Sequence, residues 1–465
     1  MKKIEKIIND FANTPDLIVR EIKKGFKTIY IIYLETVSSG DRVNNYILRN
    51  IANTVKRANN LKELIPAPNL KEITEPEIES YLCNGFTIIL IGNNIYALET
   101  KADLDRSISP SDVELGLYSP KDSLVENYQK NIGLIKRRIK SKHLKTLEQK
   151  IGKYTDTNVG VLYIDDITKP ALVNDCLAKL KDVNVEAILA AGDLKQFLIK
   201  ENSNVFPSVK LTERPDTIVK ALLAGKIVLM VDASPFALII PAFFADFVNP
   251  TVDDYSVGIN VNFLKILRLL CFLITIVTPA TYIAVANFSP EMLPNELMLD
   301  IAHQRMGVPF PSIIESLIML AVCEILRESD LRFPSNYGSA ISILGALVLG
   351  EAAVAAGIAS PIMIIIIAIT FIASLMFNDI AMNSAIRTWR FIFLISAVFF
   401  GLYGMMLAFL FMLVNLCSYE SFGMPYMYPI APLDIPYLKE TIFKSAKHHD
   451  KMRSKYLTDN LRKQR

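Results

Sequence analysis

Carboxylates within apolar sequence are the residues of this chain whose type and position could do chemistry. Glu315 and Glu324 are separated by eight uncharged residues, in a stretch that begins at Pro309. The charged residues that follow are Arg327, Glu328 and Arg332. A carboxylate among segments long enough to enter a bilayer marks either a pathway for ions or ligands, or a helix end at the membrane surface. The choice between these two interpretations largely decides the function.

Local sequence offers a structural explanation for each carboxylate. Ser312 and Glu315 have the spacing of a capping box, in which each side chain bonds a backbone N–H of the other residue. Glu324 lies nine positions after Glu315, so the two carboxylates cannot share one helix face. Arg327 follows Glu324 by three positions and Arg332 follows Glu328 by four, which is typical of ion pairs. A fully buried, unpaired Glu324 would instead be protonated or functional.

A second candidate site lies in the following segment, which is rich in small residues. Gly, Ala and Ser let helices approach closely and favour assembly within a membrane. We predict that this segment lines or supports a pore in an oligomer. The residues predicted to form the pore or gate are Ser342, Leu344, Leu347, Val348 and Glu351. The alternative is tight helix packing with Glu351 at an interface.

Motifs of enzymes and metal sites are missing from the sequence. There is no P-loop, no HExxH pattern and no CxxC pair, and the four histidines do not pair with cysteines at metal-ligand spacing. The net charge of +3 is too small to argue for nucleic acid. We therefore predict a protein that is not an enzyme, without cofactor, catalytic residues or metal.

The elements that must position these residues follow from composition. Of the 465 residues, 51% are hydrophobic, and the mean hydropathy is +0.32. Nearly uncharged stretches at 269–288, 337–377 and 391–417 are each about as long as a bilayer crossing of roughly 20 residues, or longer. Counting each apolar piece gives five spans, whereas one re-entrant piece gives four and keeps the basic tail beside the N-terminal region. The positive-inside rule favours the second count.

The N-terminal half carries an internal repeat. Residues 85–98 align on 225–238 at an offset of 140, and residues 31–45 align on 161–175 at an offset of 130. We interpret this as a duplicated α/β unit, although short β-rich patterns also match by chance. Between the copies lies a basic helix beginning near Asn131, which would face anionic lipid, an acidic partner surface or solvent. We favour the solvated face.

The predicted fold is an α/β cytoplasmic region of two similar lobes followed by an α-helical transmembrane domain with four to five spans. No apolar core of a signal peptide follows Met1, so we expect the N-terminal region to stay in the cytoplasm. The predicted domains are a first lobe at 1–105, a helical linker at 106–154, a second lobe at 155–248, a transmembrane domain at 249–430 and a basic cytoplasmic tail at 431–465.

Several motifs in this order resemble the A subunit of GerA-type spore germinant receptors. They include Arg214-Pro215-Asp216, Pro309-Phe310-Pro311, Glu324-Ile325-Leu326-Arg327-Glu328, Leu349-Gly350-Glu351-Ala352-Ala353, Ala359-Ser360-Pro361 and Ser421-Phe422-Gly423-Met424-Pro425-Tyr426. The resemblance implies a protein of the spore inner membrane that acts with a permease-like B subunit and a lipoprotein C subunit. It also implies a subunit that oligomerises into a gated ion channel and starts germination when nutrients are sensed, with germinant binding usually attributed to the B subunit.

Two departures and three alternatives accompany the resemblance. Tyr118-Ser119-Pro120 stands where the family often has Arg-Gly-Pro, which puts a lobe contact in doubt, and Leu320 stands where a glutamate is common. An accessory germination protein of the same superfamily would amplify ion release. A secondary transporter would need a repeat within the membrane, and a ligand-binding module would use a cleft between the lobes. We expect membrane lipid and a second copy of the chain as partners, and no nucleic acid.

Overall fold

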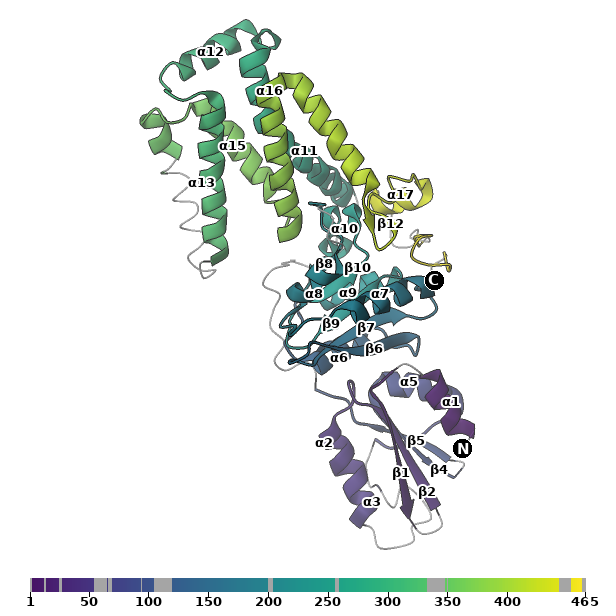
Figure 1. Ribbon diagram of the computed structural model, residues 1–465. Coiled ribbons are helices and arrows are strands. Elements are labelled where there is room, and N and C mark those ends of the chain that lie inside the picture. Colours follow the sequence, from purple (N-terminus) through teal and green to yellow (C-terminus); the bar gives the residue numbers. More distant parts are fainter. Residues whose placement is uncertain are drawn as a thin grey trace.

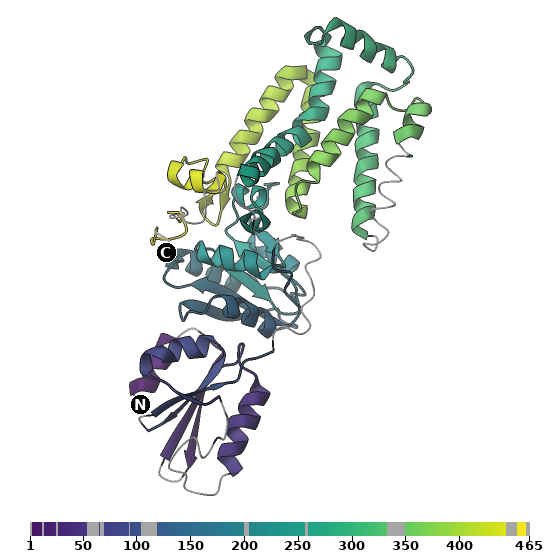
Figure 2. The same ribbon diagram turned by 180° about the vertical axis from the view of Figure 1, so that it is seen from behind.

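The protein is built from two α/β lobes and a group of long helices. The computed structural model describes residues 2–11, 14–24, 27–53, 65, 69–92, 94–103, 119–199, 204–255, 259–332, 348, 350–442 and 453–461. The lobes and the helices follow one another along the molecule in chain order (Figure 1). The N-terminus lies in the lobe farthest from the helices, and the C-terminus lies beside the second lobe, as the reverse view also shows (Figure 2).

The first lobe is an antiparallel sheet with helices on its faces. The strand order is β1-β2-β4-β5-β3. Its strands are β1 (Leu17–Lys24), β2 (Lys27–Leu34), β3 (Lys71–Glu72), β4 (Phe86–Ile91) and β5 (Asn94–Glu99). Its helices are α1 (Lys2–Asp10), α2 (Gly40–Val43), a π-helical turn (Asn44–Leu48), α3 (Arg49–Asn53) and α5 (Ile78–Cys83). Alternating strand residues such as Ile31 and Ile32 are buried in separate clusters on the two faces, so both faces of the sheet are covered.

The second lobe repeats this architecture. Its strand order, β6-β7-β9-β10-β8, puts each strand in the place of its counterpart in the first sheet. The strands are β6 (Leu144–Ile151), β7 (Thr157–Ile164), β8 (Lys210–Thr212), β9 (Ile227–Val231) and β10 (Ala237–Ile240). The helices are α6 (Tyr128–Arg138), α7 (Pro170–Asp182), α8 (Ala191–Leu198) and α9 (Pro215–Leu223). The aligned residues 85–98 and 225–238 form equivalent strand pairs, as the repeat predicts.

Two elements of the second lobe precede residue 155, where we expected the lobe to begin. β6 is an edge strand of its sheet, and Ile132 and Ile135 of α6 pack into the core of the same lobe. Lys136 of α6 is buried and its Nζ lies 2.6 Å from Oδ1 of Asp16 in the first lobe. The prediction of a solvated basic helix is therefore wrong, because charge alone does not show which face of a helix packs.

In each lobe, a segment from outside the sheet accepts a backbone hydrogen bond at the start of the helix that follows the second strand. We say that this segment closes the lobe. In the first lobe, the N–H of Ser39 donates to the carbonyl of Thr100 at 2.7 Å. In the second lobe, the N–H of Lys169 donates to the carbonyl of Leu457 at 3.1 Å. Leu457 is fully buried in the core of the second lobe, so the C-terminal residues 453–461, which we name the tail, form part of that lobe.

The remaining elements form the helical region and its connections. They are α10 (Phe244–Val248), a 3-10 turn (Thr251–Tyr255), α11 (Ile259–Phe288), a 3-10 turn (Pro290–Met292), α12 (Asn295–Arg305), α13 (Ser312–Arg332), α15 (Pro361–Ser374), α16 (Ile380–Ser418), β11 (Glu420–Ser421), β12 (Met424–Pro425) and α17 (Ile435–Ile442). Within the described residues, two helices are long and apolar enough to cross a membrane, Val261–Phe288 and Ile380–Ser418. α15 is apolar but shorter.

α16 is two helical arms and not one straight span. Gly401 has φ 58° and ψ −141°, which ends one arm, residues 380–400, and starts the next, residues 402–418. The arms fold back on each other, since the ring centroids of Trp389 and Phe411 lie 5.6 Å apart (Figure 1). Our prediction of a single last span over 391–417 is therefore wrong. Hydropathy cannot detect a turn whose only mark is one glycine in a left-handed conformation.

The tail lies on the same side of the helical region as the lobes. Nε of Arg453 donates to the carbonyl of Leu223 at 3.1 Å, and Nζ of Lys169 donates to the carbonyl of Lys455 at 2.7 Å. This is the side that the positive-inside argument favoured.

Candidate functional site

Glu315 joins α13 to the start of α15. Its side chain is buried, and Oε1 accepts hydrogen bonds from both the backbone N–H and the hydroxyl of Ser360, each at 2.6 Å. Ser360 is the N-cap of α15, so the carboxylate lies at the positive end of that helix. The hydroxyl of Ser312 instead bonds Oδ1 of Asn287 at 3.0 Å. Glu315 thus caps a neighbouring helix and not, as the capping-box interpretation predicted, its own.

The second oxygen of Glu315 is held without a partner. Oε2 is buried and makes no hydrogen bond to the described residues. Burying an unpaired polar atom costs about 1–3 kcal/mol, so such atoms are uncommon unless they serve a purpose. Chemically, this oxygen is able to accept a hydrogen bond from water or to bind a proton.

Glu324 is the centre of an ion-pair cluster that joins α13 to α16. Its Oε1 lies 2.6 Å from Nη2 of Arg390, and its Oε2 lies 3.1 Å from Nε of Arg387 and 3.7 Å from Nη1 of Arg327. The predicted ion pair with Arg327 is confirmed. Sequence spacing missed Arg387 and Arg390, because Arg390 is 66 residues away from Glu324 along the chain. Glu324 is therefore shared between three guanidinium groups from two helices.

This cluster borders a hollow of about 360 Å³ near the end of α13. Glu328 and Ser329 also line the hollow, and the Arg387 side chain is 41% exposed. The side chain of Arg332 lies outside the described residues, so its predicted pair with Glu328 stays a prediction. An exposed guanidinium next to a hollow offers a binding point for an anion or a carboxylate.

α13 and α15 are tied together near both of their ends. Glu315 and Ser360 join them at one end, and the guanidinium of Arg327 donates to the hydroxyl of Ser374 at the other. Arg327 also lies 5.4 Å from the ring centroid of Phe371. These polar contacts fix α13 against its neighbours in one position, and breaking them would release it.

A second cluster joins the second lobe to the first long helix. The buried Arg214 lies 2.6 Å from Oδ2 of Asp216 and donates to the hydroxyl of Ser119 at 3.0 Å, while the Tyr255 hydroxyl donates to Asp216 at 2.8 Å. The sequence departs from the family pattern at Tyr118-Ser119-Pro120, which put a lobe contact in doubt. Ser119 nevertheless makes a contact there, with Arg214. Further along, Nη2 of Arg268 on α11 donates to Oδ1 of Asp253 at 3.0 Å.

The partners of Asp216 set its protonation state. Burial raises the pKa of Asp216, but the hydrogen bonds from Arg214 and Tyr255 outweigh burial and hold that pKa below its usual value. Burial and the neighbouring carboxylate raise the pKa of Tyr255 to about 12. At neutral pH the cluster therefore consists of a charged arginine, a charged aspartate and a neutral tyrosine.

The predicted pore residues are described only in part. Ser342, Leu344 and Leu347 lie outside the described residues. Val348 is 54% exposed, and Glu351 is exposed at the start of a short helical stretch, residues 350–355, without an ion pair to any described residue.

Comparison with known proteins gives a consistent set of relatives. Residues 5–456 match the sequence model of a family described as Bacillus/Clostridium GerA spore germination protein. Spore germination protein KA of Bacillus subtilis is 36% identical, covering 95% of this chain and 84% of that protein. Spore germination protein GerLA of Bacillus cereus is 33% identical, covering 98% of this chain and 95% of that protein.

A solved structure is also similar. The crystal structure of the N-terminal domain of the A subunit of the Bacillus megaterium spore germinant receptor GerK3 is 24% identical, with a TM-score of 0.41, and covers 52% of this chain and 94% of that chain. Together with the two apolar helices, the relatives indicate a membrane protein with a role in spore germination. The family match over most of the chain shows that this protein belongs to the GerA family of spore germination proteins.

Proposed function

We propose that this protein is a subunit of a nutrient germinant receptor in the spore inner membrane, with the lobes in the cytoplasm. Several copies assemble into a gated ion channel whose opening starts germination. A permease-like B subunit and a lipoprotein C subunit complete the receptor. The names of the relatives, which are spore germination proteins, support a role in germination, and one structural observation supports the channel.

That observation is the exposed carboxylate of Glu351. Its exposed neighbours include Val348, Val354 and Ile358, so the carboxylate stands on an otherwise apolar surface. A charged side chain within a membrane faces a protein interior or a water-filled cavity, because facing lipid costs several kcal/mol. Among the described residues of a single chain, Glu351 has neither a protein interior nor a water-filled cavity around it. A second copy or a shared aqueous path would provide both.

The contacts of α13 suggest how such a channel is held closed. Glu324 joins α13 to α16 through Arg390, and Arg327 joins it to Ser374 of α15. The buried guanidinium of Arg390 and the partly buried carboxylate of Glu324, 2.6 Å apart, hold one helix position, and losing the carboxylate would leave a costly uncompensated charge on Arg390. We infer that Glu324 and its arginines form a latch that opening must break or rearrange.

The pore assignment is tested in spores that carry Glu351→Gln or Leu347→Ala. We expect altered ion release, either spontaneous or slowed after nutrient addition, because both changes fall in the predicted pore. Glu296→Gln is the matched control, since Glu296 is an exposed carboxylate on α12. Normal ion release and germination in both variants would contradict the pore assignment.

The latch is tested by a double-mutant cycle on Glu324 and Arg390. Glu324→Gln and Arg390→Gln should each change the threshold for ion release, and the double variant should add little to either, because the residues act as one pair. Additive effects would show that the two residues do not act together. Protein levels in the spore membrane, measured by immunoblot, separate a gating effect from loss of the protein.

The partner assignment has an independent test. A tagged copy of this chain, solubilised from spore membranes in mild detergent, should retain the permease-like and lipoprotein subunits. If it retains other copies of itself but neither subunit, and if its spores respond to nutrient only through other receptors, the accessory germination protein becomes the better assignment.

A further inference from the structure

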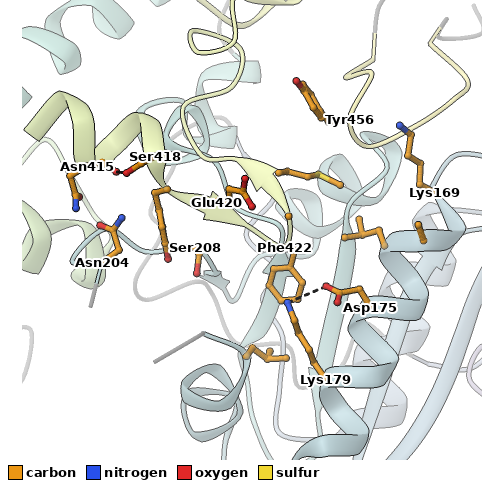
Figure 3. Close-up of a pocket in the computed structure, with 16 residues that line it drawn as sticks. Lys169, Asp175, Lys179, Asn204, Ser208, Asn415, Ser418, Glu420, Phe422 and Tyr456 are labelled. Atoms are coloured by element: carbon orange, nitrogen blue, oxygen red, sulfur yellow. Dashed lines mark hydrogen bonds and ion pairs between the residues drawn. The ribbon is translucent and has the colours of Figure 1, made fainter. Parts of the chain in front are cut away.

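A large hollow lies where the second lobe meets the end of α16. It measures about 790 Å³ and is not used by the proposed channel (Figure 3). Four segments far apart in sequence surround it: α7, the stretch after α8, the end of α16 with the β11–β12 turn, and the tail. Clefts of this size between structural units are common ligand sites.

The walls of the hollow carry charges of both signs. Lys169 and Lys179 stand on the lobe side, and Asp175 and Glu420 are the carboxylates among the described lining residues. Nζ of Lys179 lies 3.1 Å from Asp175 and 3.7 Å from the ring centroid of Phe422 (Figure 3). Nζ of Lys169 lies 3.5 Å from Oδ1 of Asp459 in the tail, so each lysine already has one carboxylate neighbour. Glu420 has no cation among the described residues, so the site lacks one positive group, which the ammonium of a zwitterionic ligand would supply while its anionic group contacts a lysine.

Two acceptors in the hollow lack a donor. Glu420 is exposed and makes no hydrogen bond or ion pair to the described residues. Oδ1 of Asn415 is buried and also has no hydrogen-bond partner among them. An ammonium group that donates hydrogen bonds would satisfy these oxygens, while an anionic group would be held by the lysines.

An exposed apolar face leads along α16 to this hollow. Leu407, Phe411 and Val414 have exposed fractions of 46%, 60% and 64%. Their spacing of four and three residues continues to Ser418, which lines the hollow, so all four lie on one helix face. A hydrocarbon chain on this face would bring its polar end to the hollow.

We propose that the hollow binds the headgroup of a zwitterionic glycerophospholipid with a primary ammonium, such as phosphatidylethanolamine. The phosphate contacts Lys169 or Lys179, the ammonium contacts Glu420 and Asn415, and an acyl chain lies along Leu407, Phe411 and Val414. An anionic headgroup would instead face the carboxylate of Glu420 without a compensating cation. The inference rests on the proposed membrane location.

Such a lipid would contact the second lobe and the end of α16 at the same time. The β11–β12 turn follows α16 directly, and Phe422 in this turn has φ 51°, a left-handed conformation that is unfavourable for a non-glycine residue. Phe422 packs against the core of the second lobe, and the Ser421 hydroxyl donates to the carbonyl of Ser208 at 2.9 Å. A headgroup beside this turn would hold the lobe and the last helical arm in one arrangement.

The test uses the purified full-length protein and native mass spectrometry. The protein in detergent is mixed with equal amounts of phosphatidylethanolamine, phosphatidylcholine and phosphatidylglycerol, and bound lipid is counted. We expect phosphatidylethanolamine to be retained about tenfold over both others, which corresponds to about 1.4 kcal/mol, because only its headgroup brings an ammonium that donates charge-assisted hydrogen bonds. Phosphatidylcholine has a phosphate but no N–H donor.

Variants then assign the ammonium contact. Glu420→Gln should reduce the preference for phosphatidylethanolamine over phosphatidylglycerol to near one, and Asn415→Leu should weaken it. We expect both variants to fold, because Glu420 is exposed and Oδ1 of Asn415 has no hydrogen-bond partner among the described residues to lose. Glu186→Gln, at an exposed carboxylate of the same lobe outside the hollow, should keep the preference of the unaltered chain.

Three outcomes would overturn the proposal. They are equal retention of the three lipids, an unchanged preference in Glu420→Gln, and full competition by free phosphoethanolamine, which would assign the hollow to a soluble ligand. Release of the protein from membranes by alkaline carbonate would instead contradict the proposed membrane function. The two failures are therefore distinguishable.

Discussion

The two lobes share one sheet order but are closed by different parts of the chain. In the first lobe, Thr100 closes the lobe immediately after β5. In the second lobe, the chain leaves the sheet after β10 to form the helical region, and Leu457 of the tail takes the equivalent position. Because the closing residue must return from the far end of the chain, the second lobe is complete only when the helical region is folded.

The first lobe is therefore closed by a residue near in sequence, and the second lobe by a residue far away in sequence. A segment that directly follows its strand loses little entropy on closing, whereas a return over hundreds of residues loses more and depends on everything between. The tail can also leave without breaking any strand pair of the second sheet. We infer that the second lobe responds to the helices and the first lobe does not.

The largest expected effect tests whether the lobes are coupled at all. Lys136→Met removes the cation beside the buried Asp16 and leaves it only the hydroxyl of Thr36 as a side-chain partner. Both side chains of the ion pair are only 7% exposed, so we expect a loss of about 3–5 kcal/mol in unfolding free energy. Hydrogen exchange in denaturant should show faster exchange in both lobes. The double variant Lys136→Met with Asp16→Asn should regain most of the loss.

Lys150→Met is the matched control for that substitution. Its ion pair with Asp156 is exposed on both sides, so exchange should change little. Destabilisation confined to one lobe in Lys136→Met would show that the two lobes unfold independently.

The next effect tests the tail as the closing element. Leu457→Ala removes a fully buried side chain from the core of the second lobe and should cost about 2–5 kcal/mol. Exchange protection should fall in β7 and β9 but not in β2 and β4. Leu461→Ala, at a partly exposed position of the same tail, should be near neutral. Equal losses in both lobes would contradict the difference in closure.

A smaller loss of stability is expected when either of two equivalent glycines is replaced by alanine. Gly85 and Gly225 have φ of 80° and 91°, and a Cβ at Gly85 would lie 2.6 Å from the carbonyl oxygen of Val37, against 3.2 Å from that of Leu457 at Gly225. Both Gly→Ala variants carry the conformational penalty, but only Gly85→Ala clashes with backbone that cannot move away. We expect thermal unfolding of Gly85→Ala to show the larger loss, by about 1 kcal/mol or more.

Gly92→Ala isolates the conformational penalty, because Gly92 has φ 59° and nothing within 4 Å of a Cβ. A loss at Gly225 as large as that at Gly85 would show that the tail is held as rigidly as the first lobe's own backbone.

The smallest expected effect is the loss of stability at low pH. Asp216 and Glu77 occupy equivalent helix starts, and both have a lowered pKa, Asp216 through buried partners and Glu77 through hydrogen bonds from Thr74 at the surface. A lowered carboxyl pKa gives stability that is present above the unfolded value near 4 and is lost as pH falls through the folded value.

We therefore expect protection of α9 to decrease when pH falls from 5 toward 3, and Asp216→Asn to remove this dependence. Glu77→Gln should leave the pH dependence of α5 almost unchanged, because Glu77 is solvated. Identical acid sensitivity in the two helices would contradict the distinction between buried and surface caps.

Local patterns predicted the features of the fold that depend on neighbours in sequence. The repeat at residues 85–98 and 225–238 located equivalent strand pairs, because strand patterns are local. The ion pair of Glu324 with Arg327 followed from helical spacing. The closure by Leu457 has no local signal, since only the completed lobe creates its position.

The site was predicted less fully than the fold, for the same reason. Glu315 bonds Ser360, and Glu324 bonds Arg390, across helices that only the tertiary structure brings together. A better signal was available in the sequence: Arg387 and Arg390 are cations flanking an apolar arm, and a carboxylate elsewhere in the membrane region is their natural counter-charge.

Because of the turn at Gly401, the chain leaves the second lobe and later returns to it. By reversing the direction of α16, Gly401 returns the chain to the lobe from which α11 departed, and the tail then fastens the end to that lobe. A displacement of the helices therefore acts on the second lobe at two attachment points, β10 and Leu457. Two attachment points make the lobe rotate together with the helices, whereas a single one would let the lobe rotate independently.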